Sequence, residues 1–326
     1  MSSPNSGIHP ASATILTPRR FGKSMEREPL IYIDGKFFEK SKAVVSVFDH
    51  GLLYGDGVFE GIRAYNGSVF RLADHVERLF DSAKSIHLRV PLTKQDLTDA
   101  ILETLRKNRL RDAYIRLVLT RGTGDLGVDP SLCTDPTLFI IAEPMASGLG
   151  PKEPRTVKLI MSSVRRDSVA ATSHEIKSLN YLNSILAKIE ANHAGVDDAI
   201  LLDQRGFVSE ASVTNIFLVK ERRVSTPSSA AGILHGITRA RILSLCSDLG
   251  LDVQERDVTP FDLVTADEVF LAGTKSEILA VGAIGGTKVG SGGVGPVTRR
   301  LYREFSRIVQ RPEEGTPIYE AEPVRA

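Results

Sequence analysis

The sequence predicts an α+β protein with two domains. At 326 residues the chain exceeds one typical domain. Strand-like and helix-like segments are mixed, without the regular strand–helix–strand order of a doubly wound sheet. Residues 145–155 contain two glycines and two prolines, a composition typical of a linker. We therefore expect a smaller domain over residues 29–144, a larger domain over 156–310, and tails at 1–28 and 311–326.

Two β-hairpins are expected to open the smaller domain. Asp34-Gly35 and Asn66-Gly67 each separate two strand-like runs, and such dipeptides favour two-residue hairpin turns. An amphipathic helix follows the second hairpin, and another begins after Thr93, where an aspartate three residues later completes the pattern of a capping box. The predicted ranges are 31–38 and 58–71 for the hairpins, 72–86 for the first helix, and 113–121 and 137–144 for further strands.

The larger domain is expected to contain further strands and helices. The strands cover residues 157–164, 199–203, 207–209, 215–219 and 269–272, and the helices cover 182–193, 237–249 and 296–309. Residues 290–295 match the glycine pattern of a dinucleotide-binding loop. Such a loop opens a strand–helix–strand unit, whereas here only one helix and a tail follow it. We therefore expect a glycine loop that leads into the last helix.

Composition bears on the classes of partner. The 41 basic and 40 acidic residues give a net charge of +1, so no long-range field gathers nucleic acid or an anionic membrane surface. No apolar run approaches the ~20 residues of a transmembrane helix. We expect neither nucleic acid nor a membrane as a partner.

The cysteines, the histidines and the N-terminal residues bear on metal binding and location. Cys133 and Cys246 are far apart, and no Cys or His pair has metal-ligand spacing. We expect no metal site and two buried thiols in a reducing compartment, which favours the cytoplasm. Residues 1–28 are rich in Ser and Pro, and their only charged residues before Glu26 are basic. A transit peptide has a similar composition, but no amphipathic arginine helix is visible, so a disordered tail is favoured.

Lys177, Tyr181 and Glu210 form the candidate catalytic set. An amine, a phenol and a carboxylate are the groups needed to hold the aldehyde, O3′ and ring nitrogen of pyridoxal phosphate. Tyr181 lies about one helical turn after Lys177, and Glu210 follows a strand end among small polar residues. Each residue also has an ordinary interpretation, because such a lysine is more often solvated and such a carboxylate can simply cap a turn. Their combination is what predicts a site.

A phosphate-binding element would complete such a pocket. Residues 234–238 open a helix with a glycine, and they offer backbone N–H groups and a hydroxyl at the positive end of the helix dipole. Gly273-Thr274 offers a similar turn after a strand. Arg78 projects from the first helix and can supply a charge-assisted hydrogen bond.

These pieces together resemble the branched-chain amino acid aminotransferases of fold type IV, pyridoxal-phosphate enzymes with the fold of D-amino-acid aminotransferase. The motifs that carry the resemblance are 49–63, 71–78, 114–116, 176–181, 210–217, 236–239 and 273–274. They run in family order over roughly residues 30–310, and their joint occurrence is far more specific than any one of them. The resemblance implies a two-domain enzyme whose larger domain binds the cofactor.

The resemblance also implies a role for each matched residue. Lys177 is implied to bond the cofactor aldehyde and to move a proton at the substrate Cα. Tyr181 is implied to bond O3′ and Glu210 the ring nitrogen. The other implied cofactor residues are Arg78, Ile237, Thr238 and Thr274 around the phosphate and Leu234 on the ring. The implied substrate residues are Tyr54, Phe59, Gly61, Arg63, Tyr114, Arg116, Thr274 and Lys275.

The implied reaction is amino transfer between the branched-chain L-amino acids (leucine, isoleucine, valine) and 2-oxoglutarate, which yields branched 2-oxo acids and glutamate. An apolar wall would take the branched side chain, while an arginine and tyrosine hydroxyls would receive the second carboxylate of glutamate. Residues 124–128 resemble a loop that reaches into the neighbouring subunit's site, which implies a homodimer or a higher homo-oligomer.

Three other functions remain open. A D-amino-acid aminotransferase and an aminodeoxychorismate lyase have the same fold and would keep Lys177 and Glu210. The third is a catalytically silent carrier of pyridoxal phosphate. The intact set of Lys177, Tyr181 and Glu210 disfavours a carrier, which has no need of an electron sink.

Three positions depart from the family pattern. Ala211 replaces the usual glycine after the implied ring-binding glutamate, and His235 stands where proline or glutamate is common. Lys275 replaces an alanine in the usual Gly-Thr-Ala-Ala-Glu turn. If the substrate carboxylate docks on that turn, Lys275 adds a cation that alters acid preference; if its side chain points to solvent, it does not.

Overall fold

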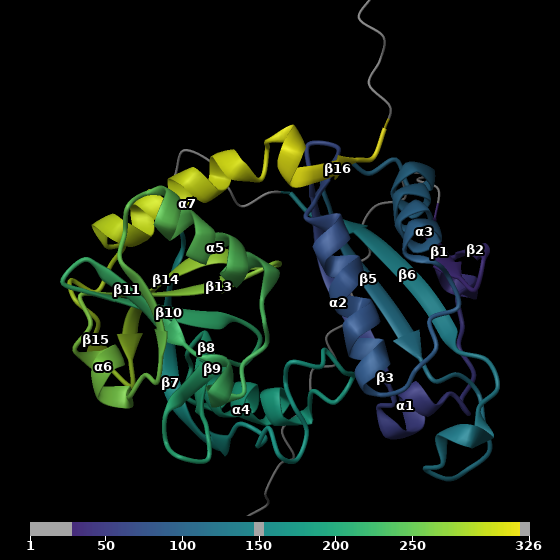
Figure 1. The fold of residues 1–326 in the computed structure, drawn as a ribbon, viewed down its shortest axis with the longest axis horizontal. Coiled ribbons are helices and arrows are strands. Elements are labelled where there is room, and N and C mark those ends of the chain that lie inside the picture. Colours follow the sequence, from purple (N-terminus) through teal and green to yellow (C-terminus); the bar gives the residue numbers. More distant parts are fainter. Residues whose placement is uncertain (1–27, 147–152, 320–326) are drawn as a thin grey trace, which may run out of the picture.

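Two β-sheets form the two halves of the molecule (Figure 1). The structure is a computed structural model that describes residues 28–146 and 153–319. Its combination of sheets and helices confirms the predicted α+β class. Most of the predicted linker (145–155) and nearly all of the predicted N-terminal tail (1–28) lie outside the described residues. The domain boundaries therefore stay a prediction.

The first sheet has seven strands in the order β16-β4-β3-β5-β6-β1-β2, and every neighbouring pair is antiparallel. Helices α2 and α3 pack against it, and α2 lies on the side that faces the second half (Figure 1). The elements are β1 (Leu30–Ile33), β2 (Lys36–Glu39), η1 (Lys40–Lys42), α1 (His50–Tyr54), β3 (Gly57–Tyr65), β4 (Ser68–Phe70), α2 (Leu72–Ser85), α3 (Lys94–Lys107), β5 (Ala113–Thr120), η2 (Pro130–Leu132), β6 (Thr137–Pro144) and β16 (Gly315–Pro317).

Both predicted hairpins are confirmed, with left-handed residues in their turns. The φ angle is 46° at Asp34 and 85° at Gly35, and it is 51° at Asn66 and 86° at Gly67. Positive φ at both central residues matches the right-handed twist of the flanking strands, and Asp, Asn and Gly tolerate it at low cost. The second turn sets the pairing of β3, which is buried along its whole length, with β4.

The second sheet has nine strands in the order β12-β11-β10-β13-β14-β7-β8-β9, with β15 beside β14. Helix α4 packs on β7 and β8, whereas α5 and α7 pack on β13. The elements are β7 (Thr156–Arg165), α4 (Leu182–His193), β8 (Asp198–Leu202), β9 (Val208–Ala211), β10 (Asn215–Lys220), β11 (Arg223–Pro227), η3 (Ser229–Ala231), α5 (Ile237–Asp248), β12 (Val253–Arg256), α6 (Pro260–Val264), β13 (Glu268–Gly273), β14 (Glu277–Ile284), β15 (Thr287–Lys288), α7 (Pro296–Ile308) and η4 (Pro312–Glu314). The predicted helices and strands of this half are confirmed to within about two residues, whereas α6, β11, β12, β14 and β15 were not predicted.

Side chains of the β3–β4 hairpin join the two halves. Tyr65 and Phe70 are buried in a core made mainly by α5, α7, β10 and β13. Phe70 meets Phe305 of α7 edge-on, with ring centroids 5.8 Å apart. The buried guanidinium of Arg63 lies 3.6 Å from Glu277 at the start of β14. These buried contacts hold the first half against the second.

The prediction of a tail from residue 311 onward is wrong for residues 312–319. Strand β16 pairs with β4, and the following Ile318 is fully buried in the core of the first half. Arg71 also pairs with Glu314 at 3.4 Å. The composition of this segment, rich in Pro and Glu, is that of a solvated tail. Its partner β4 lies near the start of the chain, so local sequence carries no sign of the pairing.

The glycine loop 290–295 leads into α7, as predicted. The carboxylate of Glu268 accepts hydrogen bonds from the backbone N–H groups of Val297 (2.9 Å) and Thr298 (2.7 Å) in the first turn of α7. A Cβ on Gly295 would lie 2.0 Å from Glu268, so the glycine permits this close approach. The carboxylate occupies the helix N-terminus that a dinucleotide phosphate would require.

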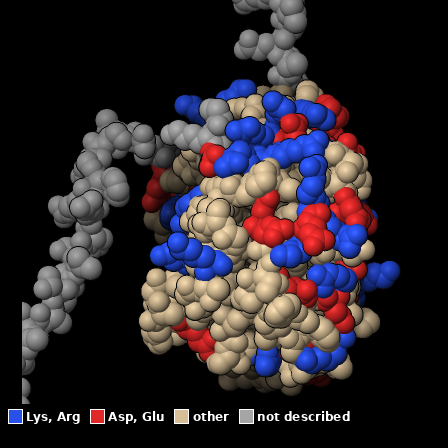
Figure 2. Space-filling view, turned by 90° about the vertical axis from the view of Figure 1, so that its left-hand side faces the viewer, with Lys and Arg blue, Asp and Glu red and all other residues tan. Residues whose placement is uncertain are grey.

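One face of the molecule carries charges of both signs. On the face shown in Figure 2, Lys and Arg side chains lie beside Asp and Glu, and neither sign covers the face. On α7, Arg299 pairs with Glu153 at 2.6 Å and Arg307 pairs with Glu304 at 2.5 Å. In the described parts of the chain, no helix is both long and apolar enough to cross a membrane, and no group of His, Cys, Asp and Glu is arranged to hold a metal ion.

Truncation of Ile318 tests whether the C-terminal segment belongs to the fold. Ile318→Ala should lower the free energy of unfolding by about 2–5 kcal/mol, because it empties a fully buried site. Denaturant titration measures this loss, and the exposed neighbour Glu313→Ala serves as the control. Equal stability of both variants would contradict the assignment of this segment to the core.

Candidate active site

A cavity of about 760 Å³ opens between the two halves. Strands β3 and β5 and helix α2 of the first half contribute to its lining, and loops at the ends of β9, β13 and β7 contribute from the second. Most of the predicted site residues line it, namely Phe59, Gly61, Arg78, Tyr114, Arg116, Lys177, Tyr181, Glu210, Leu234, Ile237, Thr238, Thr274 and Lys275. Residues that are far apart in the sequence therefore converge on one site.

Lys177 is held in this cavity by main-chain contacts with the first half. Its carbonyl accepts a hydrogen bond from the N–H of Phe59 (3.0 Å), and its own N–H donates to Ser82 Oγ (3.2 Å). Its Nζ lies 3.3 Å from the hydroxyl of Tyr181. Burial, and then the charge of Arg78, lower the pKa of Lys177 to about 8. A substantial neutral fraction near physiological pH makes this amine a capable nucleophile and base.

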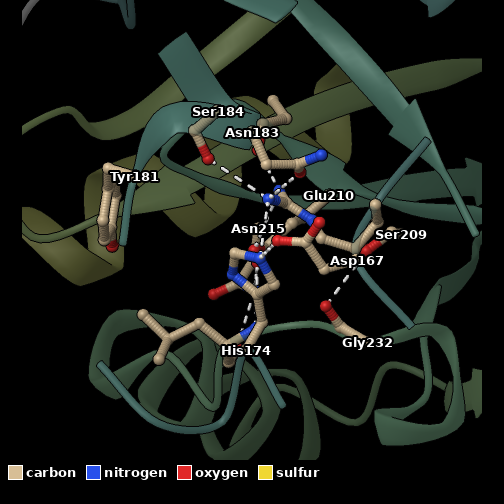
Figure 3. A network of polar contacts seen from close by, with 12 residues as sticks. Asp167, His174, Tyr181, Asn183, Ser184, Ser209, Glu210, Asn215 and Gly232 are labelled. Carbon is tan, nitrogen blue, oxygen red and sulfur yellow. Dashed lines mark hydrogen bonds and ion pairs between the residues drawn. The ribbon is translucent and has the colours of Figure 1, made fainter. Parts of the chain in front are cut away.

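Glu210 belongs to a buried polar network at β9 (Figure 3). Its carboxylate accepts hydrogen bonds from Asn215 Nδ2 (3.0 Å) and from the N–H of Leu234 (3.1 Å). Arg166 Nη2 lies 3.3 Å from its other oxygen. Burial raises the pKa of Glu210, and Arg166 is the strongest influence in the opposite direction. The charge of Arg166 and the two hydrogen-bond donors thus oppose the effect of burial on the pKa of Glu210.

Arg166 was not among the predicted site residues. Its side chain is fully buried, and its Nη1 donates to Asn183 Oδ1 and Ser184 Oγ, both at 3.1 Å, at the start of α4. His174 Nε2 lies 3.4 Å from the same nitrogen and 3.2 Å from Asp167 (Figure 3). Burial, and then Arg166, lower the pKa of His174, which favours a neutral imidazole.

Arg78 reaches the cavity from α2 and is fixed by Glu60. Its Nε and Nη2 donate to the two carboxylate oxygens of Glu60 at 2.7 and 2.8 Å, and its Nη1 donates to the carbonyl of His235 at 2.8 Å. Glu60 also lies 2.7 Å from His75 Nδ1. Burial alone would raise the pKa of Glu60, but Arg78 and then His75 outweigh it and hold that pKa at about 2. The bidentate pair keeps Arg78 in one orientation.

The N-terminus of α5 lies beside this arginine. Its N-cap residue, Gly236, provides no side-chain cap for the first N–H groups of the helix. A Cβ on Gly236 would lie 2.1 Å from Asn215 Oδ1, so close packing requires the glycine. Ile237 and Thr238 of the first turn line the cavity. Helix N–H groups next to a fixed guanidinium form a site suited to phosphate.

Two hydroxyl groups at the cavity have no hydrogen-bond partner among the described residues. They are Thr214 Oγ1 and Ser276 Oγ, both inaccessible to solvent, and both residues line the cavity. They flank Gly273, on which a Cβ would lie 3.0 Å from each side chain. Buried polar atoms are normally paired, so these two fit a ligand that supplies polar atoms. Neither residue was predicted.

One wall of the cavity combines aromatic rings with two cations. The guanidinium of Arg116 lies 4.3 Å from the ring centroid of Phe59 and donates to the hydroxyl of Tyr114 (3.1 Å). Lys275 Nζ lies 5.3 Å from the centroid of Tyr114. A Cβ on Gly61 would lie 2.4 Å from the same hydroxyl, so the glycine leaves room for the phenol. The side chain of Lys275 therefore lies along the cavity wall.

Two predicted substrate residues, Tyr54 and Arg63, do not line the cavity. Arg63 lies beyond its edge on β3, where it is 1% exposed and pairs with Glu277 between the two halves. Tyr54 ends α1, and its hydroxyl accepts a hydrogen bond from the N–H of Gly127 (2.9 Å). Tyr54 thus contacts the loop 124–128 rather than the cavity of its own chain.

Two positions that depart from the family pattern contribute backbone contacts. The carbonyl of Ala211 accepts from Arg166 at 3.4 Å, and its side chain is fully buried. The carbonyl of His235 accepts from Arg78, while its exposed ring lies near Ser229 (2.7 Å). Neither substitution obstructs the cavity.

Comparison with known proteins identifies the family. The sequence model of the family described as Amino-transferase class IV matches residues 57–284, and a protein of Methanocaldococcus jannaschii is 52% identical over 290 residues, which is 89% of this chain and 99% of that protein. This chain belongs to the class IV aminotransferases. The branched-chain-amino-acid aminotransferase of Escherichia coli is 36% identical over 281 residues, 84% of this chain and 91% of that one. The solved branched-chain amino acid aminotransferase of Thermobaculum terrenum, in its pyridoxal-phosphate form, has a TM-score of 0.82 at 30% identity and covers 90% of this chain and 100% of its own.

The cofactor of this class IV aminotransferase is pyridoxal phosphate. The residues present fit it on several counts. Lys177 supplies an amine of lowered pKa for the aldehyde. Arg78 and the uncapped N-terminus of α5 suit the phosphate. The hydroxyls of Thr214 and Ser276, which have no partner among the described residues, can form hydrogen bonds with polar atoms of a ligand.

The aminotransferase site contains two charged residues that sequence reasoning missed. Glu60 had a usable signal, because a carboxylate inside a strand of otherwise buried residues requires a buried partner. Arg166 had none: it follows strand β7 like any surface arginine, and its partners come from distant segments.

Substitution of Arg166 tests its effect on the pKa of Glu210. Arg166→Met should slow amino transfer roughly 10–100-fold at neutral pH, the worth of one hydrogen-bonded charge. Since removal of the cation raises the pKa of Glu210 further, the carboxylate ionises only at higher pH, and the variant should regain activity as pH increases. The pH dependence of kcat measures this, with the exposed neighbour Arg165→Met as the control. A loss of the same size at every pH would contradict this role.

Proposed function

We propose that this aminotransferase exchanges amino groups between branched-chain L-amino acids and 2-oxoglutarate. The observation that carries the proposal is the cavity wall, where the apolar ring of Phe59 stands next to the Arg116–Tyr114 pair. An apolar surface suits a branched side chain, and a guanidinium with a phenol suits a carboxylate. The relative from Escherichia coli, which carries the branched-chain name, supports the same assignment.

The family resemblance suggests the proposed cofactor contacts, and the lining of the cavity supports them. Arg78, the N–H groups of Ile237 and Thr238, and Thr274 would hold the phosphate, and Leu234 would pack on the ring. Bound pyridoxal phosphate supplies an electron sink for the bonds at the substrate Cα. Glu210 would lie at the ring nitrogen, where its ionised carboxylate would favour the protonated form of that nitrogen.

Lys177 is the proposed proton carrier. Its pKa of about 8 lets the neutral amine accept a proton at the substrate Cα and the ammonium return one. Burial, and then Glu210, raise the pKa of Tyr181, so its phenol keeps its proton and can donate a hydrogen bond. The two side chains lie 3.3 Å apart, which keeps the amine oriented within the cavity.

The colour of the cofactor-loaded protein tests this function directly. L-leucine should bleach the yellow of the lysine-bound cofactor, and 2-oxoglutarate should restore it, because the amino group is first taken up and then given away. Lys177→Ala should abolish both changes, with a loss of at least about 10²-fold in rate.

The same absorbance measurement and an assay for pyruvate separate the alternatives. Bleaching by D-alanine and not by L-leucine would replace the proposal with a D-amino-acid aminotransferase. Release of pyruvate from aminodeoxychorismate would indicate a lyase. A Lys177→Ala protein that still turns over would refute the mechanism.

We also propose that the protein forms a homodimer in the cytoplasm. Large apolar side chains are exposed on α4 and on the loop after β5, including Leu182 (66%), Leu126 (72%) and Val128 (82%). Exposed apolar surface of this extent usually marks an interface. The hydroxyl of Tyr54 contacts this loop, which supports a role for Tyr54 in the partner's site. Both cysteines are free thiols, which supports a reducing compartment.

A single charge on α4 tests the dimer. Leu182→Asp should shift the protein to monomers, because a buried, unpaired carboxylate at an interface costs several kcal/mol. Light scattering measures the mass, and Phe261→Asp, at an equally exposed position on α6, should leave it unchanged. A wild-type monomer would contradict the proposal.

A further inference from the structure

Besides the reacting amine of Lys177, two cations of the cavity remain after its other charges are paired. Arg78 is neutralised by Glu60, and Glu210 is paired with Arg166. Arg116 and Lys275 line the same cavity, and neither forms an ion pair with a carboxylate of the described residues.

The two unpaired cations both lie next to the side chain of Tyr114. Arg116 donates to the hydroxyl of Tyr114 (3.1 Å), while Lys275 Nζ lies 5.3 Å from the centroid of the same ring. Arg116 is also close to the reacting amine, because its guanidinium and the Nζ of Lys177 lie 4.3 and 4.7 Å from the centroid of Phe59. A substrate whose amino group is at Lys177 therefore extends along a wall that carries two positive charges.

This arrangement suits a ligand with two negative charges. A branched-chain amino acid brings one carboxylate, which leaves one of the two cations without a partner. A dicarboxylic amino acid or 2-oxo acid brings two, so both cations can be paired. We infer that Lys275 is a specificity residue that, together with Arg116, selects the dicarboxylic partner of the exchange over the monocarboxylic one. This inference rests on the proposed function and assigns the preference to Lys275, which replaces an alanine of the usual Gly-Thr-Ala-Ala-Glu turn.

The solvent exposure of Lys275 sets the size of its expected effect on diacid binding. Lys275 is exposed at the cavity mouth, so solvent screens its charge and the pairing is worth less than a buried one. We expect Lys275 to improve binding of a diacid roughly fivefold, near the upper end for an exposed ion pair. Binding of a monoacid, which Arg116 can satisfy alone, should change by less than about twofold.

Binding of unreactive acids to the cofactor-loaded enzyme tests this without turnover. Glutarate carries two carboxylates and 4-methylvalerate one, and neither has an amino or keto group that can react. Calorimetric titration should show that Lys275→Met loses roughly fivefold affinity for glutarate but little for 4-methylvalerate. Lys275→Arg should retain the wild-type preference, and Lys288→Met, exposed on β15, serves as the matched control. The ratio of kcat/KM for L-glutamate to that for L-leucine should fall by the same factor.

Two results would overturn the inference. Equal losses for both acids would mean that Lys275 binds the carboxylate that they share, and no loss for either would mean that its charge has no part in binding. If the enzyme prefers glutarate in a Lys275-dependent way but L-leucine leaves the colour unchanged, the branched-chain assignment fails while the inference stands. If L-leucine bleaches the enzyme but glutarate binding ignores Lys275, the inference fails alone.

Discussion

The bidentate ion pair between Arg78 and Glu60 is the interaction on which the site depends. Glu60 lies on the buried strand β3, so it fixes the guanidinium to the first half, while the carbonyl of His235 connects the same guanidinium to the second half next to α5. Each partner would be costly to bury alone, and the charge of Arg78 keeps the Glu60 carboxylate ionised. One arginine thus sets the spacing between the anion-binding helix N-terminus and the wall that carries Phe59.

The other buried carboxyl group of the site, that of Glu210, is also paired with an arginine. Arg166 holds Glu210 in a defined orientation, as Glu60 holds Arg78, and its charge opposes the effect of burial on the pKa of Glu210. Lys177 has no comparable partner, so burial lowers its pKa. The cofactor site therefore combines a paired carboxyl group at Glu210, a paired guanidinium at Arg78 and an amine at Lys177 that can change its protonation state. Such a separation of pKa values between neighbouring groups is the usual basis for assigning acid and base roles.

Local sequence signals predicted the features that depend on a few neighbouring residues. Turn and capping chemistry predict the Asn66-Gly67 turn and the cap at Thr93, and hydrophobic periodicity predicts the amphipathic helices. The structure confirms these features. The catalytic set and most of the pocket were found because a family resemblance linked distant motifs. Arg166 and the burial of Arg63 against Glu277 escaped prediction because their partners lie far away in sequence. Long-range pairing of this kind has no periodic signature in one chain.

The position of β16 has a consequence for how the chain matures. The edge of the first sheet at β4 is closed by residues at the far end of the sequence, and Arg71 bonds to Glu314, 243 residues later. During synthesis the first half leaves the ribosome with this edge unpaired and with the site of Ile318 empty. An unpaired edge is a template for contact with other chains. Because β16 follows the second half in the chain, the first half reaches its final form only after the second half has been made.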